Sequence, residues 1–243
     1  MLAFMQFLHD NALSPRVIAN YIASLKAKAK MLQWSCTSLL HPSIPLFIKS
    51  ITNNGSFQPK FKGNFDIPTL RKISLACNNL SDPDLYRAIF LVSFFAFLCI
   101  SNIAPHSKAA FSPFIHLLRK DVIFAPPGAH ILIKWANNMQ QTTSHKFVQI
   151  PSLNDIELCP VTAIRRLLRS RQLEKNQPLF AECNPPFLQV IDTKIRDALR
   201  HVLEVLHIPS NGHRFHVFRR SVAIAAFWLN VDIDNIKAHW ELE

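Results

Sequence analysis

A histidine and an arginine stand three residues apart near the end of the sequence, in the run from His216 to Ser221. Residues three apart share one face of a helix, so both side chains can reach the same anion. The run enters an apolar stretch of good helix formers, 221–229, and we expect it at the start of a buried helix. Because helix N-termini favour anions, the pattern indicates phosphate chemistry at His216 and Arg219.

The composition bounds the class of protein around these residues. The chain has 243 residues, 49% of them hydrophobic, enough for one large domain or for a large and a small one. It has only four glycines, which argues against a sandwich, a barrel or a nucleotide-binding loop and favours helices. The net charge of +11 favours a polyanionic partner such as nucleic acid. A basic protein without such a partner is the alternative.

Localisation, membrane and metal signals are sparse. Five cysteines without Cys-x-x-Cys spacing predict reduced thiols in an intracellular protein, in the nucleus if its partner is DNA. The apolar run 88–100 is shorter than the ~20 residues of a spanning helix, so we expect a buried helix and no membrane partner. The N-terminus lacks the basic region of a signal peptide. The spacing of the late histidines fits no ligand pattern, so no metal or other cofactor is expected.

The first part of the chain predicts a small helical module over residues 1–56. Ser14 and Pro15 are typical of a helix start. The helix that follows places apolar residues on one side, at Val17, Ile18, Tyr21, Ile22 and Leu25, and ends in Lys26, Lys28 and Lys30. These lysines complement the helix dipole and are also candidate DNA contacts. The proline-containing stretch 41–68 is typical of an interdomain linker, which we place at 57–65.

Residues 66–243 predict a second, larger domain. Asp66 or Thr69 caps a first helix, and Asp82 starts a long apolar helix that runs to Ile100. Two β-rich runs flank a polar tip and predict a hairpin. The expected elements are the hairpin strands 131–135 and 146–150 and helices over 162–171 and 193–206, ahead of the His216 run.

This order of elements resembles the tyrosine recombinases of the phage-integrase family. The run Leu158-Cys159-Pro160-Val161 after the hairpin, and the later His-x-Phe-Arg-Arg box, are most similar to the eukaryotic mobile-element branch, DIRS-type retrotransposons and Cryptons. The resemblance implies a mainly α fold with a small antiparallel β-hairpin or sheet, an integrase-like catalytic domain behind a core-binding module. It also implies duplex DNA as partner and oligomerisation on DNA through a C-terminal segment.

The resemblance further implies a chemistry of DNA recombination and integration. In the family a tyrosine attacks a DNA phosphate, two arginines and a His or Trp stabilise the phosphate oxygens, and a hairpin lysine protonates the leaving oxygen. His216 and Arg219 match one box. The next box falls on Ala238-His239-Trp240, where either His239 or Trp240 is the donor.

Three departures predict that strand transfer is lost. Cys99 stands where the first arginine is expected, Asn137 and Asn138 stand at the hairpin lysine, and no tyrosine follows Tyr86, as in a domain truncated before the nucleophile. Each missing donor costs about 3 kcal/mol of transition-state stabilisation. The sequence therefore leans away from an active enzyme.

DNA binding sums over many cations and survives such losses. Lys134 and Lys146, which flank the hairpin tip, and Arg220 are further candidate DNA contacts. Two other readings stay open, a non-functional fragment of an element-derived gene and a structural or partner-binding protein without nucleic acid.

Overall fold

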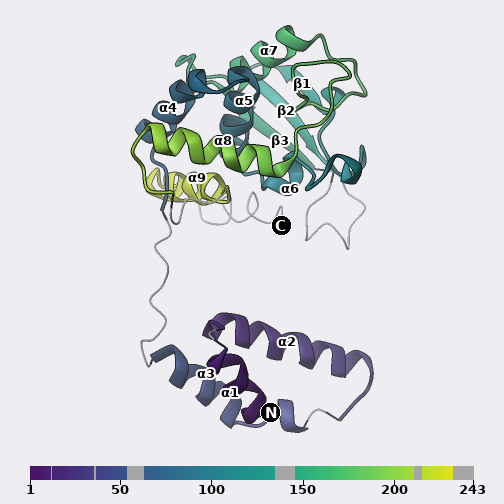
Figure 1. The fold of residues 1–243 in the computed structure, drawn as a ribbon, viewed down its shortest axis with the longest axis vertical. Helices are drawn as coiled ribbons and strands as arrows, with labels where there is room; N and C mark the ends of the chain where they lie inside the picture. Colours follow the sequence, from purple (N-terminus) through teal and green to yellow (C-terminus); the bar gives the residue numbers. More distant parts are fainter. Residues whose placement is uncertain (12, 36, 54–62, 135–145, 211–214, 232–243) are drawn as a thin grey trace. The chain divides into compact units, whose positions relative to one another are not determined.

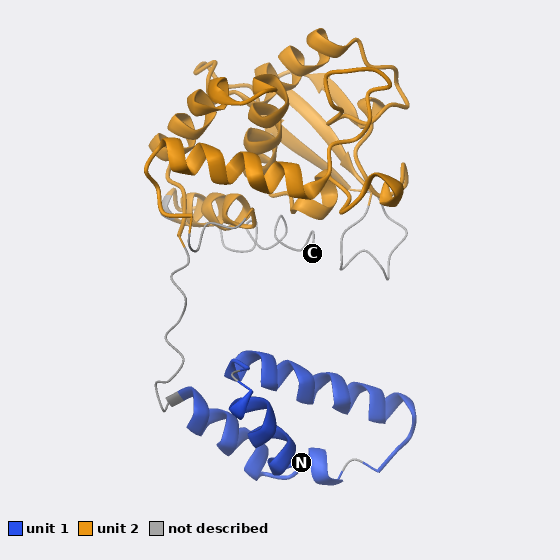
Figure 2. Ribbon diagram, viewed as in Figure 1, with its two compact units in different colours: residues 1–60 blue, residues 61–243 orange. Residues whose placement is uncertain are grey.

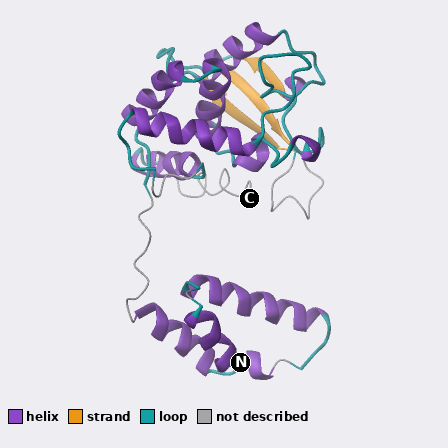
Figure 3. Ribbon diagram, viewed as in Figure 1, coloured by secondary structure: helices purple, strands orange, loops and turns teal. Residues whose placement is uncertain are grey.

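The computed structural model describes residues 1–11, 13–35, 37–53, 63–134, 146–210 and 215–231. The chain divides into two compact units, residues 1–60 and 61–243 (Figure 2). The larger unit is mostly helical with one small antiparallel sheet (Figure 3). The predicted fold class, mainly α with a small antiparallel sheet, is confirmed. No helix in the described ranges is long and apolar enough to cross a membrane.

The small unit contains three α-helices in its described part (Figure 1). They are α1 (Leu2–Asp10), α2 (Pro15–Met31) and α3 (Ser43–Asn53), with a 3-10 turn at Thr37–Leu39. Ser14 caps α2 as predicted, because its Oγ accepts a hydrogen bond from Val17 N at 3.3 Å. The core is small and consists of Met5, Leu8, Ile18, Ile22, Ile44 and Ile51.

One interpretation of this unit is wrong. The stretch 41–68 is not a linker throughout, since α3 occupies its first half. Pro45 lies in the first turn of that helix, where its missing N–H has no partner to lose. The predicted apolar side of α2 is only partly covered: Ile18 and Ile22 are buried, whereas Val17, Tyr21 and Leu25 are exposed.

The larger unit is built around α5. Its helices are α4 (Ile67–Ala76), α5 (Pro83–Phe95), α6 (Ile100–Ile103), α7 (Pro160–Arg171), α8 (Asp192–Val205) and α9 (Val217–Trp228), with 3-10 turns at Cys77–Asn79, Lys108–Ala110 and Arg119–Asp121. Asp82 caps α5, because its Oδ1 accepts from Leu85 N. Every residue of α5 from Leu85 to Phe94 is buried, and the helix contacts α4, α7 and α9. It is the central core helix of this unit.

The helix predicted to reach Ile100 ends at Phe95. Phe97 has a positive φ of 55°, which breaks the helix, and Cys99 then begins the short helix α6. This break moves Cys99 out of the buried helix and into a turn at its end. The remaining caps follow the sequence: Asp66 Oδ1 accepts from Thr69 N at 2.8 Å.

The sheet has three antiparallel strands in the order β1 (Val122–Ala125), β2 (Gly128–Ile133) and β3 (Lys146–Pro151). His130 pairs with Gln149 and Ile131 with Val148, which confirms the predicted hairpin strands. Strand β1 was not predicted; Pro126 and Pro127 form the turn that joins it to β2. The predicted polar tip, 137–144, lies outside the described residues, as does Trp135.

Candidate phosphate-binding site

The His216 run begins α9, as predicted, with His216 at the N-cap position. Phe218 fixes this end of the helix in the core. Its ring centroid lies 5.4 Å from that of Phe65, 5.3 Å from that of Phe90 and 5.3 Å from that of Phe215. Phe65 N also donates a 2.6 Å hydrogen bond to the buried Ser221 Oγ. The helix start is therefore held on several sides before any ligand binds.

Arg219 and His216 converge on Cys99. Arg219 Nη1 donates to the Cys99 sulfur at 3.2 Å, and His216 Nδ1 lies 4.0 Å from the same atom. Arg219 is fully buried, whereas His216 is exposed and Cys99 half-exposed. The turn after α5 and the start of α9, more than 100 residues apart in sequence, thus build one site, and Cys99 occupies its third corner.

The chemistry of the site follows from these three groups. A guanidinium and an imidazole that share one neighbour form a donor pair for a single anion, and charge-assisted hydrogen bonds of this kind are strong. A thiol at the third corner offers no further cation. The arrangement can hold a phosphate, but with fewer positive donors than an arginine at residue 99 would provide.

Arg220 follows the pair and is half-buried. Its Nε and Nη2 have no hydrogen-bond partner among the residues that the structure covers, and burial lowers the pKa of its guanidinium. An arginine remains charged despite such a shift. Arg220 therefore brings a poorly solvated cation next to the site.

The Lys134 ammonium group is engaged inside the protein and does not face solvent, where a DNA phosphate could meet it. Its Nζ is 2.5 Å from Asp121 Oδ2 and 2.7 Å from Pro113 O, and the side chain is 9% exposed. Lys134 would have to leave Asp121 to meet a phosphate. Lys146 begins β3 opposite Ile133 and is half-buried.

The remaining DNA-contact and catalytic candidates from the sequence lie in the small unit or outside the described residues. In the small unit Lys28 and Lys30 are exposed and Lys26 is half-buried. His239 and Trp240 lie outside the described residues, as do Asn137 and Asn138. No group of His, Cys, Asp and Glu that could hold a metal ion occurs within the described part of the chain.

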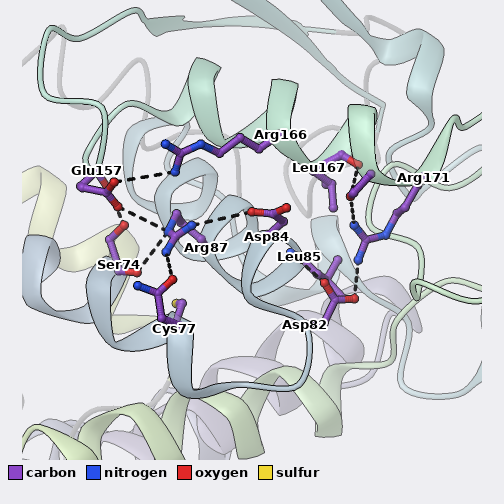
Figure 4. A network of polar contacts seen from close by, with 12 residues as sticks. Ser74, Cys77, Asp82, Asp84, Leu85, Arg87, Glu157, Arg166, Leu167 and Arg171 are labelled. Carbon is purple, nitrogen blue, oxygen red and sulfur yellow. Dashed lines mark hydrogen bonds and ion pairs between the residues drawn. The ribbon is translucent and has the colours of Figure 1, made fainter.

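Two further buried arginines belong to a polar network that the sequence did not predict (Figure 4). Arg171 Nε donates to Ala181 O at 2.8 Å, and its Nη2 pairs with the Asp82 carboxylate. Arg87 donates to Ser74 O and to Asn78 Oδ1, and it pairs with Asp84 and Glu157. Asp82 and Asp84 begin α5 and Arg171 ends α7, so the network joins two core helices.

Comparison with known proteins gives the fold class. No family model and no curated protein matches the sequence. Solved structures match it at low identity. XerH recombinase bound to its difH substrate is 14% identical with a TM-score of 0.53, over 93% of this chain and 63% of that one. The Tn1549 transposon integrase, in complex with circular intermediate DNA, is 12% identical with a TM-score of 0.58, over 98% of this chain and 74% of that one.

The λ integrase in a tetramer bound to a Holliday junction is 11% identical with a TM-score of 0.51, over 99% of this chain and 74% of that one. The chain thus spans less than two thirds of the XerH chain. These likenesses define the class by fold: the chain has the fold of the tyrosine recombinases and integrases.

Proposed function

We propose that this chain binds duplex DNA through the phosphate backbone, with His216 and Arg219 on one phosphate, and that it does not carry out strand transfer. The observation that carries the proposal is the sulfur of Cys99 at 3.2 Å from Arg219 Nη1. With a neutral thiol at residue 99 in place of a cation, His216 and Arg219 can still bind a phosphate. The site loses about 3 kcal/mol of transition-state stabilisation.

Charge and fold support the DNA partner. The net charge is +11, and the three solved structures above contain DNA. Backbone binding sums over many Lys and Arg contacts, so it tolerates the loss of single donors. Within this proposal the small unit is the core-binding module, with Lys26, Lys28 and Lys30 at the DNA. Arg220 and Lys146 are further contacts, and His239 or Trp240 is the remaining donor.

The evolutionary origin of the chain, its location in the cell and its assembly are also proposals. The Leu158–Val161 run and the His216–Arg220 box support descent from a eukaryotic mobile element of the DIRS or Crypton kind. We further propose a nuclear location and assembly on DNA.

Fluorescence anisotropy with a labelled duplex tests the binding. We expect binding at low salt that weakens steeply as salt rises, because each phosphate contact releases counterions. A flat titration at low salt would overturn the proposal. The loss of strand transfer is tested with a nicked suicide substrate, on which an active recombinase becomes trapped. Formation of a covalent protein–DNA adduct would contradict the proposed inactivity.

A further inference from the structure

A second group of cations lies in the larger unit away from the phosphate site. It consists of Lys120, Arg165, Arg169 and Lys175, which we call the edge cluster because β1 is an edge strand of the sheet. Helix α5 contacts both α7, which carries two of the four residues, and α9, which carries the phosphate site. Figure 1 shows α7 and α9 on opposite sides of α5.

Local geometry brings the four residues together. Arg165 Cζ lies 5.1 Å from the ring centroid of Phe124 on β1, which fixes one end of the cluster against the sheet. Arg169 is one turn further along the same face of α7. Lys175 follows the end of α7, and Lys175 O accepts a 3.0 Å hydrogen bond from Lys120 N. The cluster thus runs from α7 along β1 to the turn that precedes it.

The charges of the edge cluster are unmatched. All four residues are exposed, and none of them makes an ion pair with any residue that the structure describes. On the same helix, by contrast, Arg166 pairs with Glu157 and Arg171 pairs with Asp82. The one carboxylate in the 173–176 segment is Glu174. Four exposed cations without an ion pair to any described residue leave a positive surface, which favours a polyanion.

We infer that the edge cluster is a second surface for a nucleic-acid backbone, so that one chain holds two duplexes on opposite sides of α5. The inference rests on the proposed function for the first duplex. Arginines that are exposed and unpaired are suited to phosphate, since the guanidinium fork matches its oxygens. A duplex bound at His216 and Arg219 would lie on the α9 side and would leave the edge cluster open to another DNA segment.

A two-duplex capture assay tests the inference. The full chain is bound to an immobilised duplex at low salt, washed, and offered a second, fluorescent duplex. We expect the wild-type chain to retain the second duplex. The quadruple variant Lys120→Gln, Arg165→Gln, Arg169→Gln, Lys175→Gln should keep the first duplex and lose about tenfold or more in capture of the second, because up to four phosphate contacts are removed.

A charge-matched control separates local contacts from net charge. The variant Arg71→Gln, Lys72→Gln, Lys108→Gln, Lys194→Gln also removes four exposed cations, but three of these pair with Asp155 or Glu182. It should capture the second duplex about as well as the wild-type chain. Equal losses in the two variants would show an effect of net charge only and would overturn the inference.

The remaining outcomes are also decisive. If the first duplex is held and the edge variant captures the second duplex like the wild type, the inference is wrong while the proposed function stands. Aggregation of that variant with unchanged capture would assign the cations to protection of the β1 edge. Binding of fluorescent polyglutamate but not of a second duplex would assign the surface to acidic peptides and overturn the inference. Failure to bind even the first duplex contradicts both proposals.

Discussion

Arg171 and Arg219 are both buried in the larger unit, at 2% and 0% exposure, yet their neighbours differ in kind. Arg171 meets the carboxylate of Asp82, a backbone carbonyl and a hydroxyl. Arg219 Nη1 meets the sulfur of Cys99. A buried charge that only holds the fold together must be matched by an opposite charge. A guanidinium that contacts a thiol can exchange that weak acceptor for a phosphate, so under the proposed function Arg219 is the ligand-binding cation and Arg171 is the structural one.

The largest expected effect is at the structural cation. We expect Arg171→Met to lower the free energy of unfolding by about 3–5 kcal/mol, because the Asp82 carboxylate and Ala181 O lose their partner inside the protein. Urea unfolding measures the change. The double variant Arg171→Met, Asp82→Asn removes the stranded charge and keeps an oxygen for the α5 cap, so it should be more stable than the single variant. Equal stability of the two variants would contradict the role given to the ion pair.

The sequence predicts those features of the fold and of the polar network that depend on residues close together in the chain. Ser14, Asp66 and Asp82 were predicted as helix caps, because capping depends on a few neighbouring residues. The pairing of Asp82 with Arg171 was not predicted, since it joins residues 89 apart in sequence. The apolar α5 was expected from its composition, but its end at Phe95 depends on the backbone at Phe97.

In the candidate site, too, local spacing predicted some residues, whereas the positions of others depend on the tertiary structure. Spacing alone predicted that His216 and Arg219 share a helix start. The place of Cys99 came only from the resemblance of the element order to a family, because no local pattern links residues 99 and 219. Lys134 was expected near DNA because it flanks the predicted hairpin tip. The β1–β2 turn brings Lys134 to the buried Asp121 just before β1.

The second expected effect tests Arg219 directly. Arg219→Met should weaken duplex binding at low salt by about tenfold, as for the loss of one charge-assisted contact. It should lower the free energy of unfolding by less than Arg171→Met does, because the Cys99 sulfur is neutral whereas the Asp82 partner of Arg171 is charged. Anisotropy and urea unfolding give the two numbers. Arg219→Lys, which keeps the charge, should bind DNA better than Arg219→Met. A loss of stability as large as that of Arg171→Met would make Arg219 a structural cation as well.

A third expected effect comes from restoring a cation at residue 99. In Cys99→Arg two guanidinium groups lie side by side, so we expect a loss of about 1–2 kcal/mol in the free energy of unfolding without DNA. A phosphate between them relieves the repulsion. Added duplex should therefore raise the Tm of Cys99→Arg more than that of the wild type, as measured by thermal unfolding at low salt. Cys99→Ser is the control and should respond like the wild type. An equal rise in all three proteins would place the bound phosphate elsewhere.

The smallest expected effect is at a thiol beside the structural arginine network. Cys77 lies under the Arg87 network and is fully buried, with its sulfur 3.3 Å from Ile73 O. Burial raises the pKa of this thiol to about 12, against an ordinary value of 9.0. The folded state therefore keeps a proton that the unfolded chain releases above pH 9. The stabilisation is complete below that pH and is lost at about 1 kcal/mol per pH unit as the pH rises toward 12.

Urea unfolding of the wild type and of Cys77→Ala between pH 8 and about 10.5 measures this loss, since other titrating groups cancel in the difference. The wild type should lose stability faster than the variant as the pH rises. A parallel decline of the wild type and Cys77→Ala would show that the Cys77 thiol ionises as readily in the folded protein as in the unfolded chain. The Arg87 network would then not shield it from water.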